Sequence, residues 1–102
     1  MSNQIPEQLE EYRQQIDALD AELVNVLARR FAVVRAVGEL KVTEGLSVVQ
    51  SARAEEVKSR AVDRGVAKGL DPEFVRALYE MMIDHAHVLE HAIKDSAKDS
   101  AQ

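Results

Sequence analysis

The feature that most constrains this sequence is the length of its first apolar periodicity. Between Pro6 and about Thr43, apolar side chains recur at alternating spacings of three and four residues; they are Ile16, Leu19, Leu23, Val26, Val33, Val37 and Leu40. The spacing predicts one continuous α-helix. Roughly 37 helical residues make a rod of about 55 Å, whereas a compact domain of this size has a radius of gyration of about 13 Å. The chain therefore cannot cover this rod by itself.

Two further helices are expected. The stretch "TEGLS" at 43–47 is typical of a helix end, and residues from about Val49 to Arg64 form a shorter amphipathic segment that ends at "DRGVAKG". A third helix begins at "LDPEF", where Asp71 suits the N-cap and Pro72 the first helical position, and continues to about Ile93. The predicted fold is all-α, with a long, a short and a medium helix.

Domain organisation follows from the length and from the ends of the chain. The 102 residues are too few for a second core, so one domain over residues 1–102 is predicted. We expect frayed tails at about residues 1–6 and 95–102, because the first is polar and the second, "KDSAKDSAQ", repeats the polar unit KDSA.

Composition narrows the functional class. The formal net charge of -5 argues against a nucleic-acid partner, and any anion site must therefore be local. The chain has no cysteine, which fits a reducing compartment. Its first residues lack the pattern of a signal peptide, and no apolar run approaches about 18 residues. These observations predict a cytoplasmic protein with no membrane partner.

Arg30 fills the one place in the apolar stripe, between Val26 and Val33, where an apolar residue is expected. Lys41 lies eleven residues further, close to three helical turns, so both cations share one face. Burying them unpaired would cost several kcal/mol each, so protein carboxylates or an anionic ligand must meet them. The helix positions one turn from Arg30 are apolar, which favours a ligand, and the fork of arginine suits a small dicarboxylate. The alternative is an arginine that snorkels or sets partner register.

Three stretches in order, "YRQQIDALDAELVNVLARR", "VGELK" and "GLDPEFVRALYEMMIDHA", carry a family resemblance over roughly residues 8–93. The chain resembles the all-helical class of chorismate mutases, small intertwined homodimers whose long first helix spans both subunits. The resemblance implies that Arg13, Arg30, Lys41 and Arg53 are cationic site residues, with Arg13 reaching in from the other subunit. Arg13 and Arg30 are seventeen residues apart, about 25 Å along a helix, so one chain cannot grip one small ligand with both.

The reaction implied by the resemblance is the rearrangement of chorismate to prephenate in one pericyclic step, without a cofactor or metal. In that reaction Arg13 and Arg30 would hold the substrate carboxylates, which lowers the entropic part of the barrier. Lys41 would face the ether oxygen, where negative charge develops. Arg53, at the start of the second helix, could close over the ligand.

Four positions depart from the commonest family pattern. Glu90 stands where a glutamine usually donates to the ether oxygen, although some members of the wider family carry glutamate there. An ionised carboxylate can only accept, so we expect turnover to rise as pH falls below neutral. Gln50 replaces an aspartate, Ala54 a glutamate and Ala86 a serine that would bind a substrate carboxylate. Isochorismate pyruvate-lyase and 4-amino-4-deoxychorismate mutase activities on the same fold are therefore alternatives.

Readings of another class are also open. His87 and His91 are one helical turn apart, with His85 nearby, a spacing that can bind a divalent metal, but no second group of ligands is evident and no metal is expected. A non-catalytic helical dimerisation module would explain the rod, although it leaves Arg30 and Lys41 on one stripe without a partner. A larger regulatory partner enzyme is a further possible partner.

Overall fold

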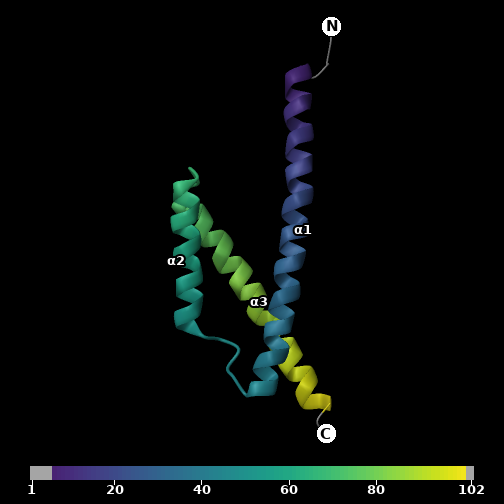
Figure 1. The fold of residues 1–102 in the computed structure, drawn as a ribbon, viewed down its shortest axis with the longest axis vertical. Coiled ribbons are helices and arrows are strands. Elements are labelled where there is room, and N and C mark those ends of the chain that lie inside the picture. The colour runs from purple at the N-terminus through teal and green to yellow at the C-terminus, as the bar shows by residue number, and fades with distance from the viewer. Residues whose placement is uncertain (1–5, 101–102) are drawn as a thin grey trace. The chain divides into compact units, whose positions relative to one another are not determined.

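The computed structural model describes residues 6–100, which form three α-helices and no strand within that range (Figure 1). Helix α1 spans Glu7–Glu44 with 38 residues, α2 spans Ser51–Ala67 with 17, and α3 spans Pro72–Ser100 with 29. The prediction of an all-α chain with a long, a short and a medium helix is confirmed. The predicted tails at residues 1–5 and 101–102 lie outside the described residues.

The helix ends are determined by capping residues that can be recognised in the sequence. Gly45, with a φ of 68°, closes α1 in a Schellman motif, in which Leu46 N–H donates to the Lys41 carbonyl at 2.8 Å. Gly69, with a φ of 84°, closes α2 in the same way. At the start of α3, Phe74 N–H donates to Asp71 Oδ2 at 2.9 Å, which confirms the predicted N-cap.

Helix α3 is longer than predicted. It continues past Ile93 to Ser100, so the predicted end near Ile93 is wrong, whereas the predicted fraying of residues 95–102 stays a prediction. The physical reason is that no glycine or proline follows Pro72, and the lysine, alanine, aspartate and serine residues of the KDSA repeat are tolerated in a helix. Polarity alone was a poor guide to where this helix stops.

The chain divides into two compact units, residues 1–32 and residues 33–102, and each is described by itself. Whether they form one domain stays a prediction. The described part of the first unit is a single helical segment of α1, most of whose large apolar side chains are exposed; Ile16, Leu19 and Leu23 keep 55%, 61% and 56% of their surface. A lone helix has nothing within its own unit on which to bury an apolar stripe.

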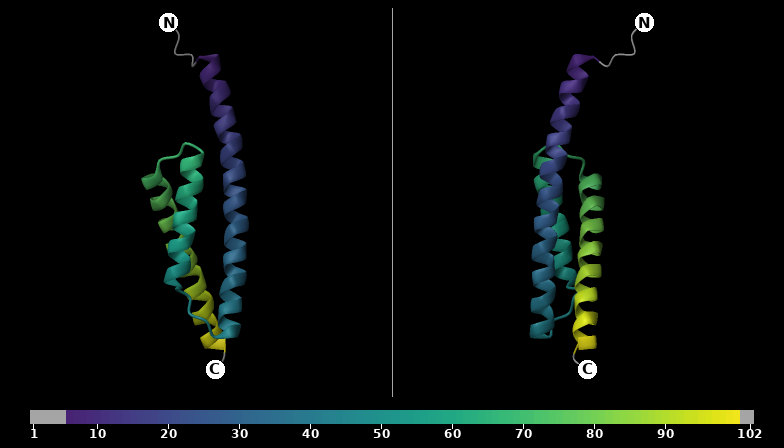
Figure 2. Two further views of the ribbon diagram at one scale, coloured as in Figure 1. Left: turned by 60° about the vertical axis from the view of Figure 1, so that its left-hand side comes forward. Right: turned by 90° about the vertical axis from the view of Figure 1, so that its right-hand side faces the viewer.

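The second unit contains the last turns of α1 together with α2 and α3. Helices α2 and α3 pack against each other in opposite directions (Figure 2). The buried apolar residues of this unit are Val48, Ala61, Val75, Ile83 and Ala86. Gly65 of α2 allows the close approach, because a Cβ there would lie 2.8 Å from Val75 Cγ2. One charged residue, Glu90, is also buried.

An exposed ion pair also joins α2 to α3. Arg76 Nη2 donates to both carboxylate oxygens of Glu55, at 2.8 and 3.1 Å. The hydrogen bond from Arg76 lowers the pKa of Glu55 below its usual value and raises the pKa of Arg76. Both groups are solvent-exposed, so this pair is a surface salt bridge rather than part of the core.

No helix of the described residues is long and apolar enough to cross a membrane.

Candidate active site

The most unusual feature of the second unit is a buried ion pair between α1 and α3. Lys41 Nζ lies 2.7 Å from Glu90 Oε1, and the two side chains keep only 15% and 6% of their surface exposed. Lys41 Nζ also donates to the carbonyl of Val48 at 2.7 Å. One ammonium group therefore joins the end of α1, the connection to α2 and the middle of α3.

Gly38 makes this pairing possible. It is buried one turn before Lys41, and a Cβ at this position would lie 3.0 Å from Ile93 Cδ1 and 3.2 Å from Glu90 Cγ. The bare backbone of Gly38 lets α3 approach α1 closely enough for the Glu90 carboxylate to reach Lys41. Gly38 carries no chemical group that marks it in the sequence, although an isolated glycine inside a strongly helical pattern is a usable signal of close packing.

Arg30 and Lys41 on the apolar stripe of α1 raised the question of which groups balance their charges, and the structure answers it for Lys41. Lys41 is met by a carboxylate of the protein, which α1 does not provide but α3 does. Its charge is therefore balanced without a ligand. Glu90, which the sequence analysis placed at the ether oxygen, is the residue that balances it.

Arg13 and Arg30 belong to the first unit. Arg13 is exposed, whereas Arg30 is half-buried and its Nη1 atom is inaccessible to solvent. Both lie on α1, and the seventeen residues between them correspond to about 25 Å of helix. One chain keeps these two arginines apart, in agreement with the expectation from the sequence.

The remaining predicted residues cluster at the start of α2 and on α3. Gln50 occupies the N-cap position of α2 without making a side-chain capping bond, and its Nε2 donates to the Ser47 carbonyl at 3.4 Å. Arg53 is 60% exposed and pairs with Glu56, so its predicted contact with a ligand requires it to leave that partner. Ala54 is half-buried one turn after Gln50.

Ala86 is buried one helical turn before Glu90 on α3 and therefore faces the same side of that helix. Its methyl group offers no hydrogen bond there. Glu90 is the one polar side chain among the buried residues named above.

The histidines of α3 do not form a metal centre in the part of the chain that the structure describes. His85 and His91 are exposed and His87 is half-buried. Within residues 6–100, no group of three or more histidine, aspartate or glutamate side chains is arranged to hold a metal ion.

Comparisons with known proteins agree on one family. The family model for chorismate mutase type II matches residues 12–91. A 4-amino-4-deoxychorismate mutase from Streptomyces pristinaespiralis is 30% identical over 82 residues, which are 80% of this chain and 64% of that protein. A 4-amino-4-deoxychorismate mutase from Streptomyces venezuelae is 32% identical over 76 residues, 74% of each chain. The match thus spans less than two thirds of the length of the first of these relatives.

Proposed function

Because this chain belongs to the chorismate mutase type II family, we propose that it is a chorismate mutase that rearranges chorismate to prephenate without covalent catalysis. The observation that supports the proposal most directly is the buried Lys41–Glu90 pair, with Val48 as the second acceptor for Lys41. A buried, oriented ammonium group is the kind of preorganised donor that stabilises charge developing on an oxygen in a transition state.

The proposed reaction breaks a carbon–oxygen ether bond as a carbon–carbon bond forms, within one substrate. The protein has to hold the substrate in a reactive conformation and stabilise negative charge on the ether oxygen. In this mechanism Arg30 of one chain and Arg13 of a second copy bind the substrate carboxylates. These contacts fix the conformation of the substrate. Lys41 donates to the ether oxygen, and Arg53 closes over the ligand after leaving Glu56.

Glu90 gives the proposal a distinctive pH dependence. An ionised Glu90 carboxylate is an acceptor and cannot donate to the ether oxygen, whereas the protonated form can. We expect turnover to rise as the pH falls below neutral and expect the Glu90→Gln variant to flatten the profile, because the amide donates at every pH. The rate of chorismate loss measured across pH checks this, and a rate that peaks at alkaline pH would refute the assigned role of Glu90.

The proposal also requires a homodimer with shared sites. A single chain separates Arg13 and Arg30 by about 25 Å, and the first unit exposes an apolar stripe that a second α1 would cover. Sedimentation velocity of the purified protein checks this point. A monomer at assay concentration would contradict both the shared site and the proposed activity.

A second candidate is 4-amino-4-deoxychorismate mutase, the activity named for both relatives above. An amine on the substrate ring would need acceptors, and the side-chain carbonyl of the exposed Gln50 is one that could serve. Isochorismate pyruvate-lyase activity is a third possibility on this fold. Purified protein incubated in parallel with chorismate, isochorismate and 4-amino-4-deoxychorismate, with products identified, decides among the three.

A non-catalytic dimerisation module is the alternative of another class. A bicyclic diacid that mimics the transition state would stabilise the enzyme against thermal unfolding but would leave such a module unchanged. We further propose a cytoplasmic location for the enzyme, and we keep regulation by a larger partner enzyme as a proposal to be tested by co-purification.

A further inference from the structure

The KDSA repeat near the end of the chain is helical, and its period of four has a structural consequence. Residues four apart lie on the same face of a helix, so Lys94 and Lys98 are neighbours on one face of α3, and Asp95 and Asp99 on another. The repeat therefore separates its charges by sign across the helix. The proposed catalytic mechanism uses none of these four residues.

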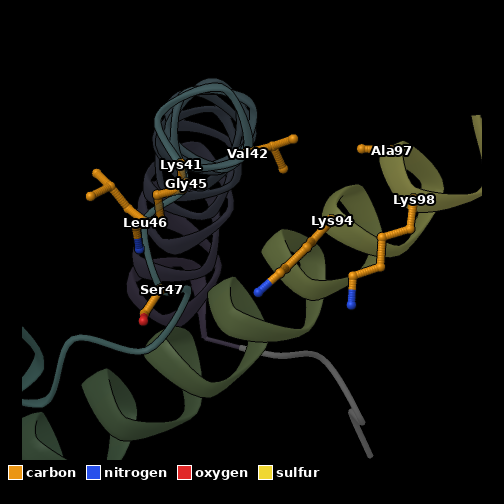
Figure 3. A pocket seen from close by; sticks show the side chains of 8 residues that line it. All are labelled: Lys41, Val42, Gly45, Leu46, Ser47, Lys94, Ala97 and Lys98. Atoms are coloured by element: carbon orange, nitrogen blue, oxygen red, sulfur yellow. The ribbon is translucent and has the colours of Figure 1, made fainter. Parts of the chain in front are cut away.

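Lys94 and Lys98 line a pocket between α3 and the end of α1. The cavity has a volume of about 320 Å³ and is lined by Lys41, Val42, Gly45, Leu46, Ser47, Lys94, Ala97 and Lys98. Figure 3 shows that both lysines extend from the same side of α3 and that Val42 and Ala97 point toward one another. The pocket lies entirely within the second unit. We call it the lysine pocket.

The two lysines that α3 contributes to this pocket are not paired within the described part of the chain. The ion pairs among residues 6–100 engage other cations, and neither Lys94 nor Lys98 takes part in one. Two like charges four residues apart on a helix repel each other and destabilise it slightly. The protein as a whole carries a net charge of -5, so these two cations run against its general balance.

Apart from Lys41 and Ser47, the other side chains that line the lysine pocket are apolar. Val42 and Ala97 are half-buried, and Leu46 keeps 48% of its surface exposed at the pocket edge. Lys41 also lines the pocket, but its ammonium group is held by Glu90 and by the Val48 carbonyl. An anionic group in this pocket would therefore be met by Lys94 and Lys98, and the rest of the ligand by aliphatic carbon.

We infer that the lysine pocket is a second small-molecule site, which binds an organic carboxylate with an apolar body about the size of one ring. A volume of about 320 Å³ lies at the lower end of the range for ligand pockets. The carboxylate lies between the ammonium groups of Lys94 and Lys98, and the apolar body lies against Val42 and Ala97, which point toward one another (Figure 3). The proposed catalytic ligand is a dicarboxylate that binds arginines, so the two sites differ in ligand class.

The position of this site couples it to the Lys41–Glu90 pair. Leu46 and Ser47 line the pocket and directly precede Val48, whose carbonyl accepts from Lys41. A ligand that fixes residues 45–47 also fixes Val48 and so changes how Lys41 is held. By thermodynamic linkage, a ligand bound at Lys41 changes the affinity of the lysine pocket by the same factor.

Phenylacetate is a suitable probe, since it combines one carboxylate with one ring. The experiment follows the backbone and methyl NMR signals of the full chain during titration with phenylacetate, inorganic phosphate or benzyl alcohol. We expect saturable shifts at Leu46 and Ala97 with phenylacetate, and binding about tenfold weaker with phosphate, which lacks the ring, and with benzyl alcohol, which lacks the charge.

The variant Lys94→Gln/Lys98→Gln removes both cations without placing a new group in the core, because Lys98 is exposed and Lys94 only half-buried. We expect this variant to weaken phenylacetate binding about tenfold. The matched control Lys68→Gln neutralises an exposed lysine at the end of α2, outside the lysine pocket, and should leave the affinity unchanged. Circular dichroism checks that all variants keep their helical content.

Three results would overturn the inference. The first is the absence of saturable shifts up to about 10 mM phenylacetate, or equal affinity in parent and Lys94→Gln/Lys98→Gln protein. The second is shifts centred on Ala86 and Glu90, which would place the probe in the candidate active site instead. The third is a change in self-association caused by the two substitutions, which would mean that a second copy of the chain covers the pocket. None of these results depends on enzymatic activity.

Discussion

The two units of this chain differ in how far they bury apolar and charged side chains. In the described part of residues 1–32, apolar side chains stay in contact with solvent, and Leu19 keeps 61% of its surface. In residues 33–102, Val75 is 4% exposed, and even a carboxylate, Glu90, is only 5% exposed. The second unit thus buries some of its apolar side chains and one carboxylate within itself, whereas the apolar stripe of the first unit stays exposed.

This difference teaches where each unit gets its stability. Burial of apolar surface is the main favourable term in folding, and an isolated helix gains little of it. The second unit buries apolar side chains between α2 and α3 and closes them with the Lys41–Glu90 pair. The first unit has to find that surface outside itself, which is why we propose a second copy of α1 as its partner.

The largest expected effect comes from a charge placed on the exposed apolar stripe. We expect Leu19→Asp to abolish self-association and to lower turnover on the order of 100-fold, because the proposed site needs residues of both chains. Sedimentation velocity and a chorismate assay measure the two effects. Ala21→Asp is the control, because it adds the same charge two residues further, on the opposite face of the helix. Equal dissociation by both variants would argue against a stripe-mediated dimer.

The second prediction breaks the internal pairing of the second unit. Lys41→Met leaves the buried Glu90 carboxylate without its cation, and we expect the free energy of unfolding to fall by about 3 kcal/mol at neutral pH, as measured by urea denaturation.

A second lysine whose side chain is covered to a similar extent provides the control for this prediction. Lys58 is covered to a similar extent, with 17% of its side chain exposed against 15% for Lys41, but its partners Glu55 and Glu80 are 58% and 50% exposed. We expect Lys58→Met to cost less than about 1 kcal/mol. Equal losses in the two variants would mean that burial of the carboxylate is not what makes the Lys41 pair important.

The third prediction compares two buried glycines of the second unit. A Cβ added at Gly38 would press on Ile93 and Glu90, and one added at Gly65 would press on Val75. We expect each alanine variant to lose about 1 kcal/mol, because overpacking outweighs the better helix propensity of alanine. Only Gly38→Ala should also lower turnover, about tenfold, because it displaces Glu90. Steady-state kinetics of both variants check this, and a similar loss of turnover in Gly65→Ala would leave Gly38 without a specific role.

The smallest effect concerns the exposed Glu55–Arg76 pair. Arg76 lowers the pKa of Glu55 in the folded state, so the pair stabilises the fold above the usual pKa of 4.5 and loses this contribution as pH falls through the lowered value. We therefore expect Arg76→Gln to reduce the urea midpoint slightly at pH 7 and to match the parent at about pH 2.5. A difference that persists in acid would have to come from packing of the arginine side chain.

The fold was predictable from the sequence because its helices rest on local signals. The three- and four-residue spacing on α1, Asp71 at the N-cap of α3 and Gly45 at the end of α1 each act within a few residues along the chain. The end of α3 was not predictable in the same way, since no glycine or proline marks a stop before Ser100. Polar residues are compatible with both a helix and a tail.

The pairing of Lys41 with Glu90 was not predictable from the sequence, and the predicted membership of the site stays a prediction. Lys41 and Glu90 were both identified, yet their pairing joins residues 49 positions apart in the sequence, and no local pattern encodes such a contact. Gly38 and Val48 were missed because one acts through its lack of a side chain and the other through a backbone carbonyl. Neither property belongs to a residue type that signals chemistry.

The geometry around Lys41 has a consequence for what it can recognise. An ammonium group has three N–H bonds in a tetrahedral arrangement, and one of those of Lys41 donates to the Val48 carbonyl while the Glu90 carboxylate lies 2.7 Å away. These two fixed neighbours limit the directions from which a further oxygen can approach, so Lys41 selects its ligand by angle as well as by charge. A planar guanidinium at this position would present its donors in a fixed fork and could not reproduce the tetrahedral arrangement of the ammonium N–H bonds.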